Sequence, residues 1–229
     1  MPQHIGIAAC SAEGAALCYR TICTEGAQFL GPHAHPEVSV HTHSLADYTA
    51  CLERDDWAGV GALMLASAEK LAAIGADFLV FPDNTVHQAL PGIAERLPRP
   101  WLHIAEVVAE EALGRGFRRL GLMGTRWLVA SEVYPETLAA RGLAAVRPSA
   151  EDGAAVDRII MEELVYGLVT SDSRARLREA VAALQAEGCD AVVLGCTELP
   201  LILDDETSPL PTLDSTRLLA RAALARAVS

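Results

Sequence analysis

The chain contains two stretches with nearly the same pattern, 113 residues apart. Residues 75–87 read GADFLVFPDNTVH, and residues 188–200 read GCDAVVLGCTELP. In both stretches a glycine ends a helical pattern, a short apolar run predicts a buried strand, and a polar loop follows. At this one offset Asp83 corresponds to Cys196. The repeat therefore predicts a duplicated α/β unit.

The flanking segments correspond as well. LASAEKLAAIGAD at 65–77 is matched by LREAVAALQAEGCD at 177–190, and HIGIAAC at 4–10 is matched by RLGLMGT at 119–125. Open α/β sheets bind ligands at the carboxyl ends of their strands, and each copy presents one reactive side chain at such an end. We therefore predict an α/β protein with two parallel-sheet lobes that face each other across one cleft, which holds the active site.

Three prolines between residues 91 and 100 mark the crossing from one lobe to the other. We predict a first lobe of residues 1–100 plus the C-terminal helix 213–229, and a second lobe of residues 101–212. The expected strands are 4–10, 38–43, 78–81, 119–123, 143–147 and 191–195. The expected helices begin after the Ser11–Gly14 loop and run to about 28, then cover 57–75, 104–115, 130–141, 152–167, 174–187 and 214–228.

Composition and charge exclude several kinds of partner. Hydrophobic residues make up 51% of the chain and aromatic residues 5%, which is typical of strands buried under closely packed helices. The net charge of −12 argues against nucleic acid and against an anionic membrane surface. A small amino acid or carboxylate remains a suitable partner, since it needs only local hydrogen-bond donors.

The N-terminus and the cysteines indicate a cytoplasmic protein. The first ten residues read as a strand rather than an export signal, and no apolar run reaches the ~18 residues of a membrane span. The six cysteines form no C-x-x-C motif and no evident disulfide framework. Reduced thiols are therefore expected.

Asp83 and Cys196 together suit proton transfer at a carbon atom. Burial raises the pKa of a carboxyl group, and converging N–H donors lower that of a thiol, so both groups can exchange protons near neutral pH. One group could remove a proton from one face of a substrate while the other returns a proton to the opposite face. Taken singly, each has a plainer interpretation, since Asp is an ordinary turn residue and Cys an ordinary small buried residue.

Polar groups in the same loops could bind a substrate carboxylate and stabilise an enolate-like intermediate. These predicted substrate-binding residues are Ser11, Asn84, Thr85, Thr125 and Thr197.

Three histidines and a glutamate have supporting roles in this hypothesis. His87 and His103 are either proton relays and carboxylate donors or hydrogen-bonded structural residues. His43 belongs to one of two H-x-H pairs, but no further ligand has the spacing of a zinc site, so we expect no metal. Glu198 is expected to cap or charge a helix start, with support of the site as the lesser alternative.

Several motifs together resemble the aspartate/glutamate racemase family. They are FPDNTVH at 81–87, WLHIAE at 101–106, GLMGT at 121–125, EEL at 162–164 and GCTELPLI at 195–202. The resemblance implies a cofactor-independent (PLP-independent) isomerase with two Rossmann-like lobes related by pseudo-twofold symmetry, commonly a homodimer. It also implies that two cysteines flank the substrate's α-carbon, of which Cys196 is the second.

The chain departs from this family at the first cysteine, where it has Asp83. It also has His-Thr-His-Ser at 41–44 and Tyr-Gly at 166–167, where aspartate-specific members carry basic residues. The main hypothesis is an amino-acid racemase or epimerase in which Asp83 and Cys196 serve opposite faces. Alternatively, Asp83 only positions a group and Cys196 works alone, as in an arylmalonate-type decarboxylase or another one-cysteine isomerase. A non-enzymatic small-anion-binding protein is the remaining alternative.

Overall fold

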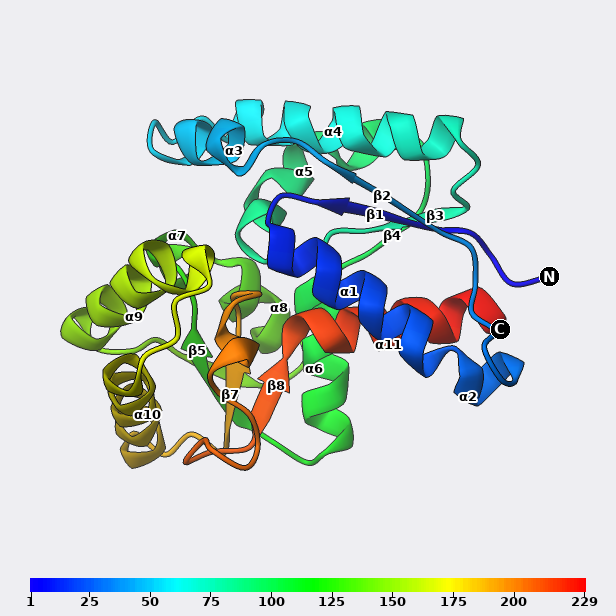
Figure 1. Ribbon diagram of the computed structural model, residues 1–229. Helices are drawn as coiled ribbons and strands as arrows, with labels where there is room; N and C mark the ends of the chain where they lie inside the picture. The colour runs from blue at the N-terminus through cyan, green and yellow to red at the C-terminus, as the bar shows by residue number, and fades with distance from the viewer. The chain divides into compact units, whose positions relative to one another are not determined.

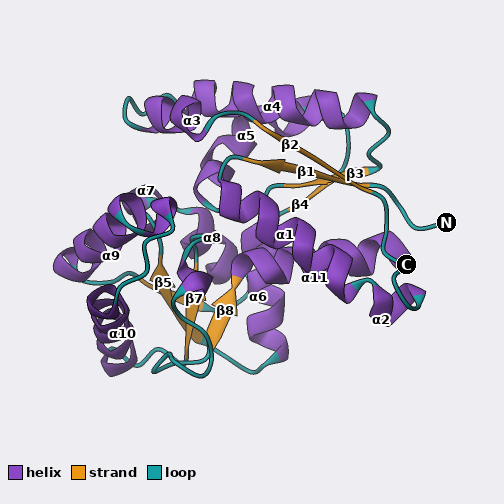
Figure 2. Cartoon of the chain, in the orientation of Figure 1, coloured by secondary structure: helices purple, strands orange, loops and turns teal.

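The computed structural model describes all 229 residues, which divide into two compact units. Unit 1 comprises Met1–Ile104 and Thr216–Ser229, and unit 2 comprises Ala105–Ser215. Each unit contains one four-stranded parallel sheet with helices packed against it (Figures 1 and 2). The predicted α/β class with two parallel-sheet lobes is thereby confirmed.

The elements of unit 1 follow the repeat predicted from the sequence. Its strands are β1 (Ile5–Ala9), β2 (Val38–Thr42), β3 (Phe78–Val80) and β4 (Trp101–Leu102). Its α-helices are α1 (Ala12–Glu25), α2 (Ala27–Leu30), α3 (Leu45–Leu52), α4 (Trp57–Ala73), α5 (Leu90–Ile93) and α11 (Ser215–Val228), with 3-10 helices η1 (Thr85–Ala89) and η2 (Ala94–Arg96). The strand order is β2-β1-β3-β4. Figure 2 shows α3 and α4 on one face of this sheet and α1 and α11 on the other.

Unit 2 has the same strand order with its own helices. Its strands are β5 (Arg119–Met123), β6 (Ala144–Val146), β7 (Ala191–Leu194) and β8 (Thr212–Asp214), arranged β6-β5-β7-β8. Its α-helices are α6 (Ile104–Gly114), α7 (Arg126–Ala130), α8 (Val133–Ala139), α9 (Ala150–Glu162) and α10 (Ser171–Ala186), with 3-10 helices η3 (Leu164–Tyr166) and η4 (Leu199–Leu201).

Strand register confirms the internal repeat residue by residue. Gly6 of β1 pairs with Leu79 of β3, and Gly121 of β5 pairs with Val192 of β7, the residue 113 positions after Leu79. The aspartates before β3 and β7 also correspond. Asp77 N–H donates to the carbonyl of His4 and Asp190 N–H to that of Arg119, at 2.8 and 2.9 Å.

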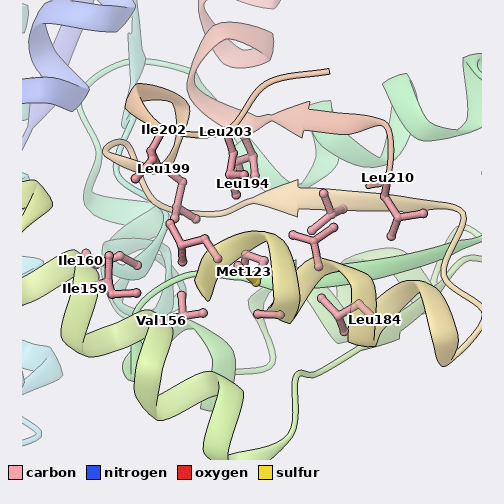
Figure 3. Packing of buried hydrophobic residues seen from close by; sticks show 14 of the residues in the cluster. Met123, Val156, Ile159, Ile160, Leu184, Leu194, Leu199, Ile202, Leu203 and Leu210 are labelled. Atoms are coloured by element: carbon pink, nitrogen blue, oxygen red, sulfur yellow. The ribbon is translucent and has the colours of Figure 1, made fainter. Parts of the chain in front are cut away.

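The core of unit 2 lies between its sheet and two helices. Figure 3 shows side chains of α9, α10 and the segment after β7 meeting on one face of the sheet. The cluster includes Val156, Ile159 and Ile160 from α9, Leu184 from α10 and Leu194 from β7, all with at most 2% of their surface exposed. Apolar residues spaced three and four apart on α9 place one helical face in this cluster, as the period of an α-helix requires.

Short elements are where the sequence-based prediction was wrong. It gave three strands per lobe, whereas β4 and β8 each add a fourth strand of two or three residues. Each of these strands follows a proline whose carbonyl accepts a hydrogen bond from the neighbouring strand, Pro100 from Leu79 and Pro211 from Val192. Two or three residues are too few to show a two-residue period, which explains the omission.

Two helical segments also differ from the prediction. Helix α3 was not predicted, because only Tyr48 and Leu52 of its residues are buried and give no repeated pattern. The helix expected at 130–141 is α8, whereas the short helix α7 before it was not predicted. Ser131 donates its hydroxyl to the Leu128 carbonyl where α7 ends. None of the helices is both long and apolar enough to span a bilayer.

Candidate functional site

The carboxyl edge of the first sheet gathers several of the predicted residues. Strand order and register place His43 after β2, Cys10 after β1 and His103 after β4 along this edge. Asp83 follows β3 at the same edge. The fold alone therefore brings these groups into one row within unit 1.

Asp83 is a buried carboxylate, 6% exposed, held by three donors from the β1–α1 connection. One oxygen accepts from the Cys10 N–H at 2.7 Å. The other accepts from the Ser11 N–H at 3.2 Å and from the Ser11 hydroxyl at 2.5 Å. Ser11 also caps α1, because its hydroxyl oxygen accepts from the Gly14 N–H at 2.9 Å.

These donors favour the negatively charged form of Asp83. Two backbone amides and a hydroxyl point at the carboxylate, and the amino end of the 14-residue helix α1 lies behind them. The sequence-based hypothesis assigned the donors of the Ser11 loop to a substrate carboxylate. In the structure the Ser11 amide and hydroxyl are engaged by Asp83 instead.

The segment after Asp83 carries two further predicted binding residues and a buried histidine. Asn84 is buried, and Thr85 is half-buried at the start of η1. His87, also in η1, is 1% exposed, and its Nε2 lies 2.9 Å from the Phe81 carbonyl oxygen. Because a carbonyl only accepts, Nε2 carries the proton, which leaves the buried Nδ1 as a lone pair with no hydrogen-bond partner.

Burial is the main reason that His87 stays neutral. Burial, followed by the charge of His103, lowers the pKa of His87 from its ordinary 6.5 to about 3. The two rings meet edge to face with centroids 4.7 Å apart. His87 is therefore not a cationic donor for a carboxylate near neutral pH, and its one N–H is engaged by the Phe81 carbonyl.

His43 and Tyr48 lie at the other end of this edge. The Nε2 atom of His43 is buried without a hydrogen-bond partner, and its ring is 5.0 Å from that of His41. Tyr48 is buried, and burial, followed by the negative charges of Cys10 and Asp83, raises its pKa. Tyr48 was absent from the predicted site, because the helix that carries it was itself not predicted.

The carboxyl edge of the second sheet presents Cys196. The Gly195 N–H donates to the carbonyl of Met123 at 2.7 Å, which fixes the loop after β7 against the end of β5. A Cβ on Gly195 would lie 2.8 Å from that same carbonyl oxygen, so only glycine fits this close approach. Cys196 follows directly and is half-buried.

Glu198 holds the two side chains before it. The Cys196 thiol lies 2.9 Å from Glu198 Oε2, and the Thr197 hydroxyl donates to the same oxygen at 2.7 Å. Glu198 and Thr197 are both buried, with 4% and 3% of their surface exposed. Thr125, the remaining predicted binding residue, caps α7, and its hydroxyl oxygen accepts from the Leu128 N–H at 3.4 Å.

Cys10 and Glu198 contact the two main site residues, although neither was predicted to have a principal role. Cys10 was not among the predicted site residues, but it is half-buried and its N–H donates to Asp83. Glu198 was expected to cap or charge a helix start, with support of the site as the lesser alternative, and its carboxylate accepts from the Cys196 thiol. The i, i+2 spacing of Cys196 and Glu198 was the available signal, since a loop of this length can return one side chain to the other.

Comparison with known proteins identifies the family of the fold. The family model described as Asp/Glu/Hydantoin racemase matches residues 7–223. A crystal structure from Yersinia pestis, described as a candidate Asp/Glu racemase, is 27% identical with a TM-score of 0.88. The match covers 99% of this chain and 100% of that one.

Two curated relatives match over shorter segments. The broad specificity amino-acid racemase RacX of Bacillus subtilis (strain 168) is 26% identical over 67% of this chain and 66% of its own length. A glutamate racemase of Thermus thermophilus is 34% identical over 64% of this chain and 54% of its own length. The chain thus spans between about half and two thirds of these relatives.

Proposed function

Because the chain belongs to the Asp/Glu/Hydantoin racemase family, we propose that it is an amino-acid racemase or epimerase that works without a cofactor. The observation that carries the proposal is the matched position of Asp83 and Cys196. They follow β3 and β7, the corresponding strands of two sheets with the same order. The name of the Bacillus subtilis relative supports an amino acid as the substrate class.

In the proposed mechanism Asp83 and Cys196 act on opposite faces of the substrate's α-carbon. The Asp83 carboxylate removes the α-proton, and the electron pair passes into the substrate carboxylate to form an enolate-like intermediate. The Cys196 thiol then gives its proton to the other face. The cycle leaves a protonated Asp83 and a Cys196 thiolate, which perform the reverse inversion or exchange protons with water.

The remaining predicted residues hold the substrate in this proposal. Asn84, Thr85 and Thr125 supply amide and hydroxyl groups for its α-carboxylate and α-amino group. Thr197 donates its O–H to Glu198, so its hydroxyl oxygen serves as an acceptor for the α-amino group. These contacts act best on the charge of the enolate-like intermediate, which is where fixed donors lower a barrier most.

A reaction at a single thiol is the second candidate. The observation that favours it is the engagement of Asp83 by three donors, which suits a carboxylate that organises the β1–α1 connection. Cys196 would then protonate one face only, as in a decarboxylase or a one-cysteine isomerase.

Proton NMR in D₂O with a panel of L- and D-amino acids tests both candidates. The racemase predicts loss of the α-proton signal together with formation of the enantiomer, which chiral chromatography detects. Exchange without inversion would support the single-thiol reaction. An absence of exchange with every amino acid of the panel would contradict the racemase proposal.

A further inference from the structure

The buried carboxylate of Glu198 lies directly against the thiol of Cys196. Its Oε2 atom is 2.9 Å from the Cys196 sulfur and 2.7 Å from the Thr197 hydroxyl oxygen. Only 4% of the Glu198 surface is exposed, so water contributes little to the solvation of this carboxylate. A buried carboxylate needs donors, and here the S–H and O–H groups of its two preceding neighbours supply them.

A thiolate at the same position would bring two negative charges into contact. At 2.9 Å and out of water their repulsion is strong, because the local dielectric constant is far below that of water. The arrangement therefore favours the state in which the carboxylate is charged and the sulfur keeps its proton.

The strands that flank β7 place an acidic and a basic residue at this edge. Asp214 ends β8 beside β7 and adds a further negative charge. Arg126 begins α7 after β5, but its guanidinium is 3.0 Å from Asp157 and stacks on the Trp127 ring at 3.8 Å from the centroid. The Arg126 guanidinium is thus engaged by its own carboxylate.

We propose that Glu198 is a positioning residue that keeps Cys196 as a protonated thiol, so that unit 2 is the proton donor of the resting protein. The proposal rests on the proposed function, because it says which of the two proton-transfer groups carries the proton before the reaction begins. Unit 1 holds the complementary state, since the three donors on Asp83 favour its charged, proton-accepting form.

The proposal has a consequence for turnover. When Cys196 gives its proton to the carbon atom, the S–H bond breaks, a C–H bond forms, and a thiolate remains beside the Glu198 carboxylate. The negative charge of Glu198 destabilises this thiolate, so the sulfur regains a proton readily. The two directions of inversion then start from protein states of unequal stability, and the direction that begins with proton removal by Asp83 has the favoured starting state.

Alkylation of Cys196 by iodoacetamide measures its proton directly and needs no turnover. The rate is followed as a function of pH by peptide mass spectrometry in the wild-type protein and in Glu198→Gln. We expect Glu198→Gln to react ~10-fold faster at pH 7 and its profile to move to lower pH, because the charge is gone and an amide N–H can donate to the thiolate. Unchanged or slower alkylation in a folded Glu198→Gln would overturn the proposal, since it would mean that the carboxylate does not hold the proton or helps to remove it.

Glu163→Gln is the matched control. Glu163 belongs to the same unit and accepts a hydrogen bond from the Ser173 hydroxyl, so the substitution removes a comparable carboxylate away from Cys196. Its Cys196 profile should coincide with that of the wild-type protein. A shift as large as that of Glu198→Gln would overturn the local interpretation.

A second measurement needs no variant, in case Glu198→Gln does not fold. The alkylation profile of Cys196 in the native wild-type protein should lie at higher pH than in the urea-unfolded chain. A native profile at lower pH would overturn the proposal. The D₂O exchange experiment reports separately on racemisation, so failure of the proposed function and failure of this inference give different results.

Discussion

Unit 1 and unit 2 have the same strand order and corresponding pairings, yet they hold the residue after the third strand in different ways. In unit 1 the carboxylate of Asp83 is held by two backbone amides and a hydroxyl. In unit 2 the thiol of Cys196 is held by the carboxylate of Glu198. Backbone donors stabilise negative charge, whereas a carboxylate stabilises a proton on its neighbour. The same scaffold thus supports opposite proton states through a few loop residues.

The histidines are distributed unequally between the two units. All seven histidines lie within residues 4–103 of unit 1, and unit 2 contains none. One of them, His87, is fully enclosed beside the Asp83 loop. Mild acid should therefore act on unit 1 through a group that unit 2 lacks, in addition to the carboxylates that both units share.

Cys196→Ser is expected to give the largest effect, because it removes the proposed donor of unit 2. A serine hydroxyl ionises far less readily than a thiol, so racemisation should fall by about 100- to 1000-fold, the usual contribution of a general acid or base. Initial rates of α-proton exchange and of enantiomer formation measure the loss. Cys189→Ala, which removes the other thiol of this unit, should retain activity, and near-normal turnover of Cys196→Ser would contradict the assignment.

Asp83→Asn tests the corresponding group of unit 1. An amide can accept from Ser11, but its NH₂ group then faces the Cys10 N–H, and a donor is left without an acceptor. We expect a loss of about 1–3 kcal/mol in the free energy of unfolding, together with a loss of activity on the order of 100-fold. Urea unfolding and the exchange assay measure the two effects.

Asp77→Asn separates these effects. Asp77 lies just before β3 at the opposite edge of the sheet and accepts from the His4 N–H at 2.7 Å. Its substitution should lower stability without lowering activity. If Asp83→Asn likewise loses stability but keeps its activity, Asp83 only positions the loop and does not transfer a proton.

His87→Gln sharpens the comparison of pH sensitivity. The His87 pKa is about 3 in the folded protein and near 6.5 when unfolded, so above pH 6.5 both states are neutral. As the pH falls below 6.5, the unfolded chain binds a proton that the folded protein does not take up until about pH 3, and stability decreases. Between pH 7 and pH 4.5 this contribution is on the order of 2 kcal/mol.

Gln keeps a donor for the Phe81 carbonyl but does not titrate, so His87→Gln should lose less stability over this range than the wild-type protein. Urea unfolding at pH 7 and pH 4.5 measures the difference. His35→Gln, at an exposed position of the same unit, should behave as the wild type does. Equal acid sensitivity of His87→Gln and wild type would show that His87 is not the responsible group.

How far the sequence predicts this protein depends on whether a feature is repeated or local. The offset between Asp83 and Cys196 placed both residues after corresponding strands, because the repeat reports register as well as type. The contacts that decide their chemistry were not predicted. The bonds of Ser11 to Asp83 and of Glu198 to Cys196 depend on side-chain torsions and loop paths that no periodic pattern encodes.

Gly6 of β1 and Gly121 of β5 hold corresponding positions in the two sheets, and the difference in stability between their alanine variants should be the smallest of these effects. A Cβ on Gly6 would lie 2.9 Å from the Ala76 Cβ and 3.0 Å from the Leu79 Cδ2. A Cβ on Gly121 would lie 2.8 Å from the Leu184 Cδ1, the far end of a flexible side chain, and 3.2 Å from the Leu184 Cβ. We expect Gly6→Ala to cost about 1–3 kcal/mol and Gly121→Ala about 1 kcal/mol less. The Leu184 Cδ1 can shift and its Cβ lies at 3.2 Å, whereas the Ala76 Cβ lies at 2.9 Å and has no rotamer to change.

Urea unfolding of the two variants measures this difference. Gly92→Ala is the control, since a Cβ there meets no atom within 4 Å and alanine is a better helix former than glycine, so stability should be equal or slightly higher. Equal losses for Gly6→Ala and Gly121→Ala would mean that the packing around the two strands accommodates an added methyl group equally well. The difference between the units that matters for the proposed chemistry would then lie at their carboxyl edges, where a carboxylate stands in one and a thiol in the other.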